Sequence, residues 1–134
     1  MERYTVTIVH LNTQSKLSLI IEADEAETTE EIILCTQIED DCLSASNYGY
    51  FTAFQELRDK LLQKGYGVKC VGSKENVVQS SMACATNKVY EVVLGKQTAV
   101  NNSICLYDYA EINEFPNSNT QNEYAEKWVR SLRK

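Results

Sequence analysis

The chain has 134 residues, of which 43% are hydrophobic and 24% charged, with a formal net charge of -6 at pH 7. This length fits one domain that buries roughly two-thirds of the surface its unfolded form exposes, and the scarcity of Gly and Pro excludes fibrous and disordered classes. No apolar run approaches the ~20 residues of a membrane-spanning helix, and the first residues lack a signal-peptide core, so we expect a cytoplasmic protein with no membrane partner.

Alternation of apolar and polar residues predicts strands in the first forty residues. Residues 4–11 and 16–23 both alternate, and the short polar stretch between them predicts a hairpin. Residues 31–38 are ambiguous, since Glu30 and Glu31 suit a helix start whereas the β-branched content suits a strand, and we prefer the strand. A polar loop is expected from Asp40 to Asn47.

The middle of the chain changes to helical spacing. Apolar side chains three and four residues apart predict a helix over about residues 50–64, ended by Gly65. A short buried strand is expected over 68–71, a turn at Gly72 and Ser73, and a helical or irregular turn over 80–84.

Two further strands and a helix are expected at the end of the chain. The strands are predicted over residues 89–94 and 104–109. Thr120 and Glu123 form a capping-box pattern, which predicts a helix over about residues 120–133 with an apolar stripe that includes Trp128 as a core residue. The whole pattern predicts one α+β domain over 1–134, with a mostly antiparallel sheet and two principal helices.

Charge is distributed very unevenly. Residues 17–57 contain ten carboxylates and no Lys, Arg or His, so this window carries -10 while the rest of the chain sums to +4. A one-sided field steers a positively charged partner into contact, although acidic runs also serve simply as solvated loops. Direct binding to RNA or DNA is disfavoured, because a chain this acidic and without a basic stripe repels phosphate.

Catalytic patterns are weak. The five cysteines form no CxxC pair and no metal-ligand spacing, so we expect buried thiols and neither a metal nor another cofactor. His10 falls in the inward register of the first strand and reads as a partly buried structural residue. Nucleophile-elbow, Walker, dinucleotide-binding and zincin motifs are all missing from the sequence. The alternative to a binding protein is a small enzyme that uses Cys70 or Cys84 with His10, or a carboxylate pair.

The second half of the chain resembles a known family. The residues that carry the likeness are Leu61–Gly65, Val68–Val77, Ser80-Ser81-Met82, Val89–Gly95, Ile104–Asp108, Gln121 and Glu123–Val129. Together, from about residue 51 to 132, they resemble small immunity proteins of bacterial polymorphic-toxin and contact-dependent growth inhibition systems. Within that stretch we expect Ser80, Ser81 and Met82 to shape the fold, with Met82 filling an irregular gap.

The resemblance implies a cytoplasmic protein that binds the toxic C-terminal domain of a cognate effector and has no catalysis of its own. Toxin domains that cut tRNA or DNA need basic clefts to hold phosphate, and carboxylates of an inhibitor can occupy such a cleft. A few large side chains usually anchor an interface of this kind. The candidate contacts are therefore five acidic residues of the window, with one or both of two tyrosines as aromatic anchors: Glu30, Glu31, Glu39, Asp40 and Asp41, and Tyr48, Tyr50 or both.

Overall fold

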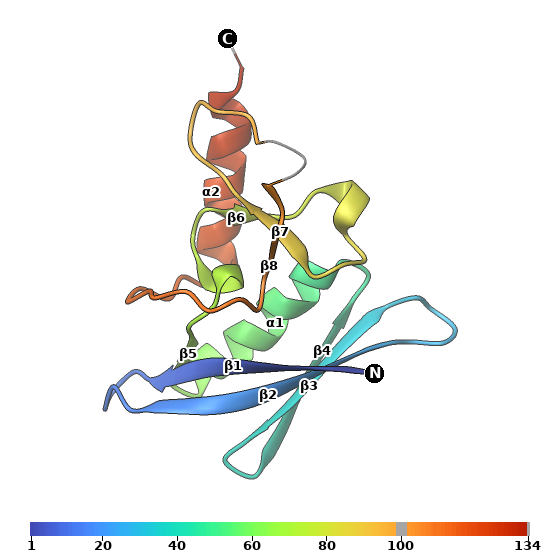
Figure 1. The fold of residues 1–134 in the computed structure, drawn as a ribbon, viewed down its shortest axis with the longest axis vertical. Helices are drawn as coiled ribbons and strands as arrows, with labels where there is room; N and C mark the ends of the chain where they lie inside the picture. Colours follow the sequence, from blue (N-terminus) through green and yellow to red (C-terminus); the bar gives the residue numbers. More distant parts are fainter. Residues whose placement is uncertain (99–101, 134) are drawn as a thin grey trace.

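The computed structural model of the chain describes residues 1–98 and 102–133 (Figure 1). Its first half contains β1 (Glu2–His10), β2 (Lys16–Glu25), β3 (Ile32–Ile38), β4 (Asp41–Asn47), α1 (Tyr50–Gln63) and β5 (Tyr66–Val68). Its second half contains η1 (Val71–Ser73), β6 (Val77–Val78), η2 (Ser81–Ala83), β7 (Lys88–Glu91), β8 (Ile104–Cys105) and α2 (Ser118–Ser131), where η marks a single 3-10 turn. The fold is α+β with two principal helices, as the sequence predicts. Among the described residues, no helix is long and apolar enough to cross a membrane.

The larger sheet is antiparallel and has the strand order β4-β3-β2-β1-β5. Toward the β5 edge of this sheet, Ile8 of β1 lies between Leu17 of β2 and Val68 of β5. Apolar residues on one face are buried while most of those between them face outward, as expected for a sheet covered on one side. The predicted hairpin and the preferred third strand are both confirmed.

The polar loop predicted from Asp40 to Asn47 is wrong, because these residues form β4 at the edge of the sheet. β4 pairs with β3 along its whole length, from Ile38 opposite Asp41 to Ile32 opposite Asn47. Only Ala45 of this strand is buried. The strand therefore depends on backbone hydrogen bonds to its neighbour, which a search for apolar alternation does not detect.

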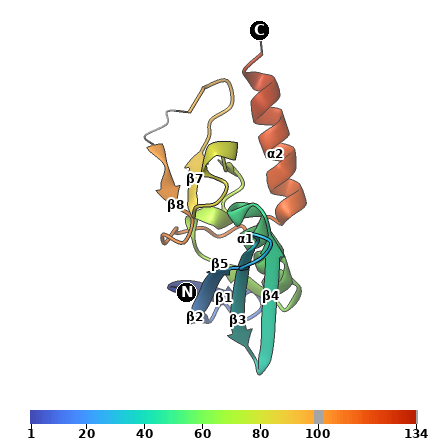
Figure 2. The ribbon, with the colours of Figure 1, turned by 90° about the vertical axis from the view of Figure 1, so that its right-hand side faces the viewer.

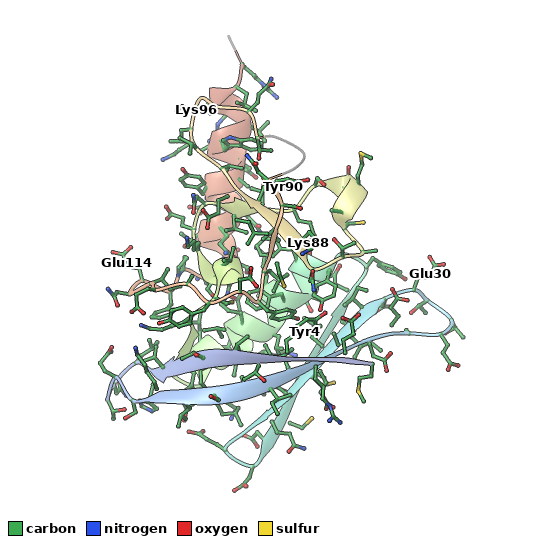
Figure 3. The ribbon with its side chains drawn as sticks, in the orientation of Figure 1. Tyr4, Glu30, Lys88, Tyr90, Lys96 and Glu114 are labelled. Atoms are coloured by element: carbon green, nitrogen blue, oxygen red, sulfur yellow. The ribbon has the colours of Figure 1, made fainter. Side chains whose placement is uncertain are left out.

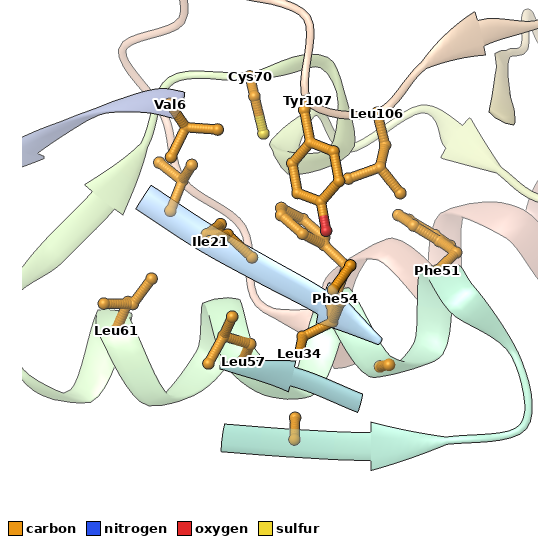
Figure 4. Close-up of a cluster of buried hydrophobic side chains, with 14 of the residues drawn as sticks. Val6, Ile21, Leu34, Phe51, Phe54, Leu57, Leu61, Cys70, Leu106 and Tyr107 are labelled. Carbon is orange, nitrogen blue, oxygen red and sulfur yellow. The ribbon is translucent and has the colours of Figure 1, made fainter. Parts of the chain in front are cut away.

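Helix α1 covers the inner face of the larger sheet and matches its predicted bounds closely. Phe54, Leu57 and Leu61 are completely buried at helical spacing, and Figure 4 shows them facing Ile21 and Leu34 of the strands. Gly65 follows the helix with φ +92°, a left-handed conformation that glycine adopts without steric cost.

The strands of the second half are shorter than predicted. The predicted strand over 68–71 is displaced, because β5 ends at Val68 and Val71 already belongs to η1. Strand β8 ends at Cys105, yet Leu106 and Tyr107 after it are buried against α1, so their apolar character reflects packing and not membership of a sheet. Strands β6, β7 and β8 form a separate small sheet, and η2 lies where a helical or irregular turn is expected.

Helix α2 begins earlier and packs more loosely than predicted. The Asn117 side chain accepts a hydrogen bond from the Thr120 amide at 2.9 Å and caps the helix, so the capping box at Thr120 is wrong. Trp128 is only partly buried, and its indole N–H donates to the Lys96 carbonyl at 2.9 Å, so its assignment to the core is also wrong. Figure 2 shows α2 at the margin of the molecule, projecting away from the larger sheet.

Candidate functional site

The carboxylates proposed as one binding surface lie at two opposite ends of β3. Glu30 and Glu31 lie where the chain enters β3, in the connection from β2, whereas Glu39 and Asp40 form the turn into β4. Seven residues of strand separate the two groups, a distance of about 23 Å. The structure therefore does not bring the predicted set together, and the two ends must be considered separately.

Side chains from elsewhere already engage the carboxylates of the β3–β4 turn. Asp41 forms an ion pair with Lys64 at the end of α1, and the Tyr66 hydroxyl donates to Glu39 Oε1 at 2.7 Å. Lys64 lies at the C-terminal end of α1 and Tyr66 begins β5, so these two contacts join the turn to the helix end and to β5. Asp40 is exposed beside them. This end of the sheet consequently offers less free negative charge than the sequence suggests.

The other end gathers more negative charge than the two predicted residues supply. The β1–β2 register places Glu2 opposite Ala23, which brings the start of the chain to the end of β2 and the loop after it. We call the carboxylates at this end the acidic edge: Glu2, Asp24, Glu25, Glu27, Glu30 and Glu31. None of these six forms an ion pair with another described residue. Figure 3 shows Glu30 at the tip of the hairpin formed by β2 and β3.

A hollow of about 310 Å³ opens within the acidic edge. Its lining includes Glu2, Asp24 and Glu25 together with Tyr50. Sequence reasoning missed the first three as site residues, although the predicted β1–β2 hairpin already places the start of one strand beside the end of the other.

The two candidate aromatic anchors have different environments. Tyr48 is 65% exposed and follows β4, at the same end of the sheet as Glu30 and Glu31. Tyr50 is only 6% exposed, and its hydroxyl donates to the Tyr107 hydroxyl at 3.2 Å. Burial raises the pKa of Tyr50 well above its usual value. Tyr50 as a projecting anchor is therefore wrong, and it forms part of the wall of the hollow instead.

The residues of the alternative enzyme site do not assemble. His10 is partly buried at the end of β1, with its ring edge-on to Tyr66 at 5.1 Å. Cys70 is completely buried, and burial raises the pKa of its thiol to about 11, which disfavours the reactive thiolate at neutral pH. The Cys84 carbonyl accepts from the Tyr50 amide at the start of α1, just after the end of β4, and the strand pairing places this end of the sheet opposite to the end of β1 that holds His10.

Two expectations about sulfur-containing residues are wrong. Cys42 and Cys84 are exposed, on an edge strand and after the η2 turn, so not all five thiols act as core residues. Met82 is 98% exposed and fills no gap, although the Ser80 hydroxyl does accept from the Ala83 amide as expected. Among the described residues, no three His, Cys, Asp or Glu side chains are grouped so that they could hold a metal ion.

Comparison with known proteins adds no family assignment. No protein family model matches the chain, and no curated protein matches it significantly. The geometry above is therefore what bears on function.

Proposed function

We propose that the chain is a cytoplasmic immunity protein without catalytic activity, which binds and neutralises the toxic C-terminal domain of a contact-dependent growth inhibition effector. The observation that supports this proposal is the acidic edge, where six carboxylates gather and none forms an ion pair with another described residue. Like charges gathered without counter-charges repel one another and destabilise the free protein. A basic partner relieves that repulsion.

A nuclease domain is the toxin class that fits this surface best. Its cleft must carry Lys and Arg to hold phosphates, so the same cleft attracts a carboxylate-rich hairpin. The hollow lined by Glu2, Asp24 and Glu25 can take one basic side chain of the partner. Tyr48 lies at the same end and supplies an exposed aromatic contact. Inhibition then follows from occupying the cleft, with no chemical step.

The experiment first determines whether the neighbouring upstream reading frame encodes a large secreted effector, and then co-expresses the C-terminal domain of that effector with this protein. The proposal predicts co-purification of the two proteins and rescue of growth. A toxic, correctly folded neighbouring domain that neither binds nor is neutralised would remove the proposal.

A matched pair of variants tests the role of the acidic edge. Glu27→Lys with Glu30→Lys reverses charge at the hairpin, whereas Glu75→Lys with Glu114→Lys makes the same charge change at exposed positions elsewhere. Figure 3 shows Glu30 and Glu114 on opposite sides of the molecule. At low salt the hairpin variant should associate with the toxin about 10-fold more slowly or worse, and the control should change far less. Equal effects of the two variants would contradict the role of the acidic edge.

A further inference from the structure

Strand β4 has no described strand on one of its two sides, which we call the open side of β4. It lies at the end of the larger sheet (Figure 2) and pairs with β3 without interruption, so it contains no β-bulge. The strand carries no Lys, Arg or Pro, and Asp41 at its start is its only charged residue. Edge strands normally carry such features because they prevent pairing with other chains.

The strand at the other end of the sheet is protected. β5 has only three residues, and all of them are buried. A Cβ at Gly67 would lie 2.5 Å from the Phe115 ring, so that ring covers the middle of β5. Among the described strands of the larger sheet, β4 is therefore the one that another strand can reach.

A side chain of α1 reaches the open side of β4. The Nζ of Lys60 donates a hydrogen bond to the Ser44 carbonyl at 2.5 Å. In an antiparallel pair, a residue directs both its N–H and its C=O either toward the neighbouring strand or away from it, and the direction alternates along the strand. The contact with Lys60 places Ser44 in the outward set, so Cys42 and Ser46 also direct their backbone groups away from β3.

The turn into β4 gives the same assignment. Glu39 and Asp40 have φ values of 51° and 68° and form a two-residue hairpin turn. The residues that flank such a turn, here Ile38 and Asp41, exchange backbone hydrogen bonds. Every second residue after Asp41 then bonds to β3, which again leaves Ser44 directed outward.

The backbone of the open side of β4 is complementary to itself. When two copies of β4 run antiparallel about a two-fold axis at Ser44, each Ser44 faces its counterpart. Cys42 of each copy then faces Ser46 of the other. These are the residues whose N–H and C=O groups point outward, so each of these pairs exchanges backbone hydrogen bonds.

The side chains are compatible with the same pairing. Leu43, which packs partly against the core, lies opposite Ala45 of the other copy, which is buried. Asp41, the one charged residue of the strand, lies opposite Asn47. No like charges are therefore directly opposed in the two strands, and the apolar face under α1 continues from one copy into the other.

We propose that β4 is a pairing surface for a second copy of this chain and that Lys60 holds it closed. In the paired state each Ser44 carbonyl accepts from the other copy, so each Lys60 loses its acceptor. Both Lys60 side chains also approach the two-fold axis, where their like charges repel. Because β5 is covered, the paired state closes as a dimer and does not extend into a filament. This inference does not depend on the proposed function.

Carboxylates beyond the ends of β4 also oppose pairing. Asn47 pairs with Ile32 at the start of β3, so Asp41 of one copy approaches Glu31 of the other. Sodium chloride at about 0.5 M shortens the range of such exposed charges to roughly 4 Å. Measurements at that concentration therefore isolate the contact between Lys60 and Ser44.

Sedimentation equilibrium of four proteins in 0.5 M sodium chloride tests the role of Lys60. In Lys60→Met, which cannot donate, the mass should rise from 15.2 kDa toward twice that value, with a dissociation constant at least about 10-fold below that of the wild type. Lys60→Arg keeps the charge and the donor and should behave as the wild type does. Lys127→Met removes the charge of an exposed lysine on α2 and should also match the wild type. A monomeric Lys60→Met protein at every concentration, or equal dimerisation of Lys127→Met, would overturn the proposal.

A second variant tests whether β4 forms the contact. Ser44→Pro removes an N–H that points away from β3, and edge strands accept Pro at such positions. Added to Lys60→Met, it should restore the monomer, and circular dichroism checks that the fold is kept. In Lys60→Met alone, hydrogen exchange at the amides of Cys42, Ser44 and Ser46 should be fast in the monomer and slow in the dimer. A dimer that survives Ser44→Pro, or that leaves these amides in fast exchange, would refute pairing through β4.

Discussion

The side chain of Gln121 connects α2 to the rest of the molecule through buried hydrogen bonds, and replacing it with Leu should lower the free energy of unfolding. Its Oε1 accepts hydrogen bonds from Arg58 Nη2 at 2.7 Å and from Gln55 Nε2 at 3.1 Å. Its Nε2 donates to the carbonyls of Gly72 at 2.8 Å and Lys74 at 2.7 Å. The side chain is 1% exposed, so water cannot replace these partners in Gln121→Leu.

The magnitude follows from the groups that are left without partners. Leu has nearly the volume of Gln, so the substitution leaves little cavity. It orphans the Arg58 guanidinium N–H and the Gly72 carbonyl, both buried, at about 1–3 kcal/mol each and more for the charged group. The expected loss in the free energy of unfolding is therefore roughly 3–5 kcal/mol.

Urea denaturation of four proteins measures this loss and its origin. These are the wild type, Gln121→Leu, Arg58→Met and the double variant. Because the double variant removes both partners of the buried bond, its loss should be smaller than the sum of the single losses by about 1–3 kcal/mol. A loss below about 1 kcal/mol for Gln121→Leu, or strictly additive losses, would refute the reasoning.

Two further predictions concern the segment that follows β8. A Cβ at Gly67 would lie 2.5 Å from the ring of Phe115, so Gly67→Ala should lower the free energy of unfolding by about 1–3 kcal/mol, and an unchanged urea midpoint would contradict this packing. Hydrogen bonds from Lys69 and then from the Tyr109 hydroxyl hold the pKa of Glu111 at about 2, below its usual value near 4.5. Ionised Glu111 therefore contributes to the free energy of unfolding at neutral pH, and this contribution is lost as the pH falls from about 4.5 to about 2. The stability difference between wild type and Glu111→Gln, followed by thermal unfolding from pH 7 to 2, should shrink toward low pH, and a constant difference would contradict the ion pair.

Several elements could be predicted because their signal is local. The alternation in β1 and β2 and the helical spacing in α1 each follow from burying one face of one element. Strand β4 could not be predicted in this way, since its pairing with β3 uses backbone groups that every residue carries. The start of α2 has a local signal in Asn117, which caps the helix through the Thr120 amide, and a second, non-local hydrogen bond from the Ser118 amide to Asp59 of α1 that no pattern within the helix indicates.

The candidate site was predicted in part. The acidic window follows from the charge pattern of the sequence, whereas the exposure of Tyr48 and the position of Glu2, which lies outside that window, come from the structure. The separation of Glu30 from Asp40 was available from the strand predicted over residues 31–38, since a strand of that length places its ends far apart. The burial of Tyr50 was not available, because it depends on Tyr107, which is 57 residues later in the chain.

The sequence by itself determined the fold class, the inward faces of β1, β2 and α1, and the presence of a strongly acidic window. These properties depend on residue type and on spacing within one element. Only the tertiary structure decided which carboxylates keep their charge unpaired, since Lys64 reaches Asp41 from 23 positions away while no described cation reaches Glu30. It likewise decided that Gln121 is buried and Trp128 partly open, because burial depends on which surfaces meet across the fold and not on the pattern of one helix.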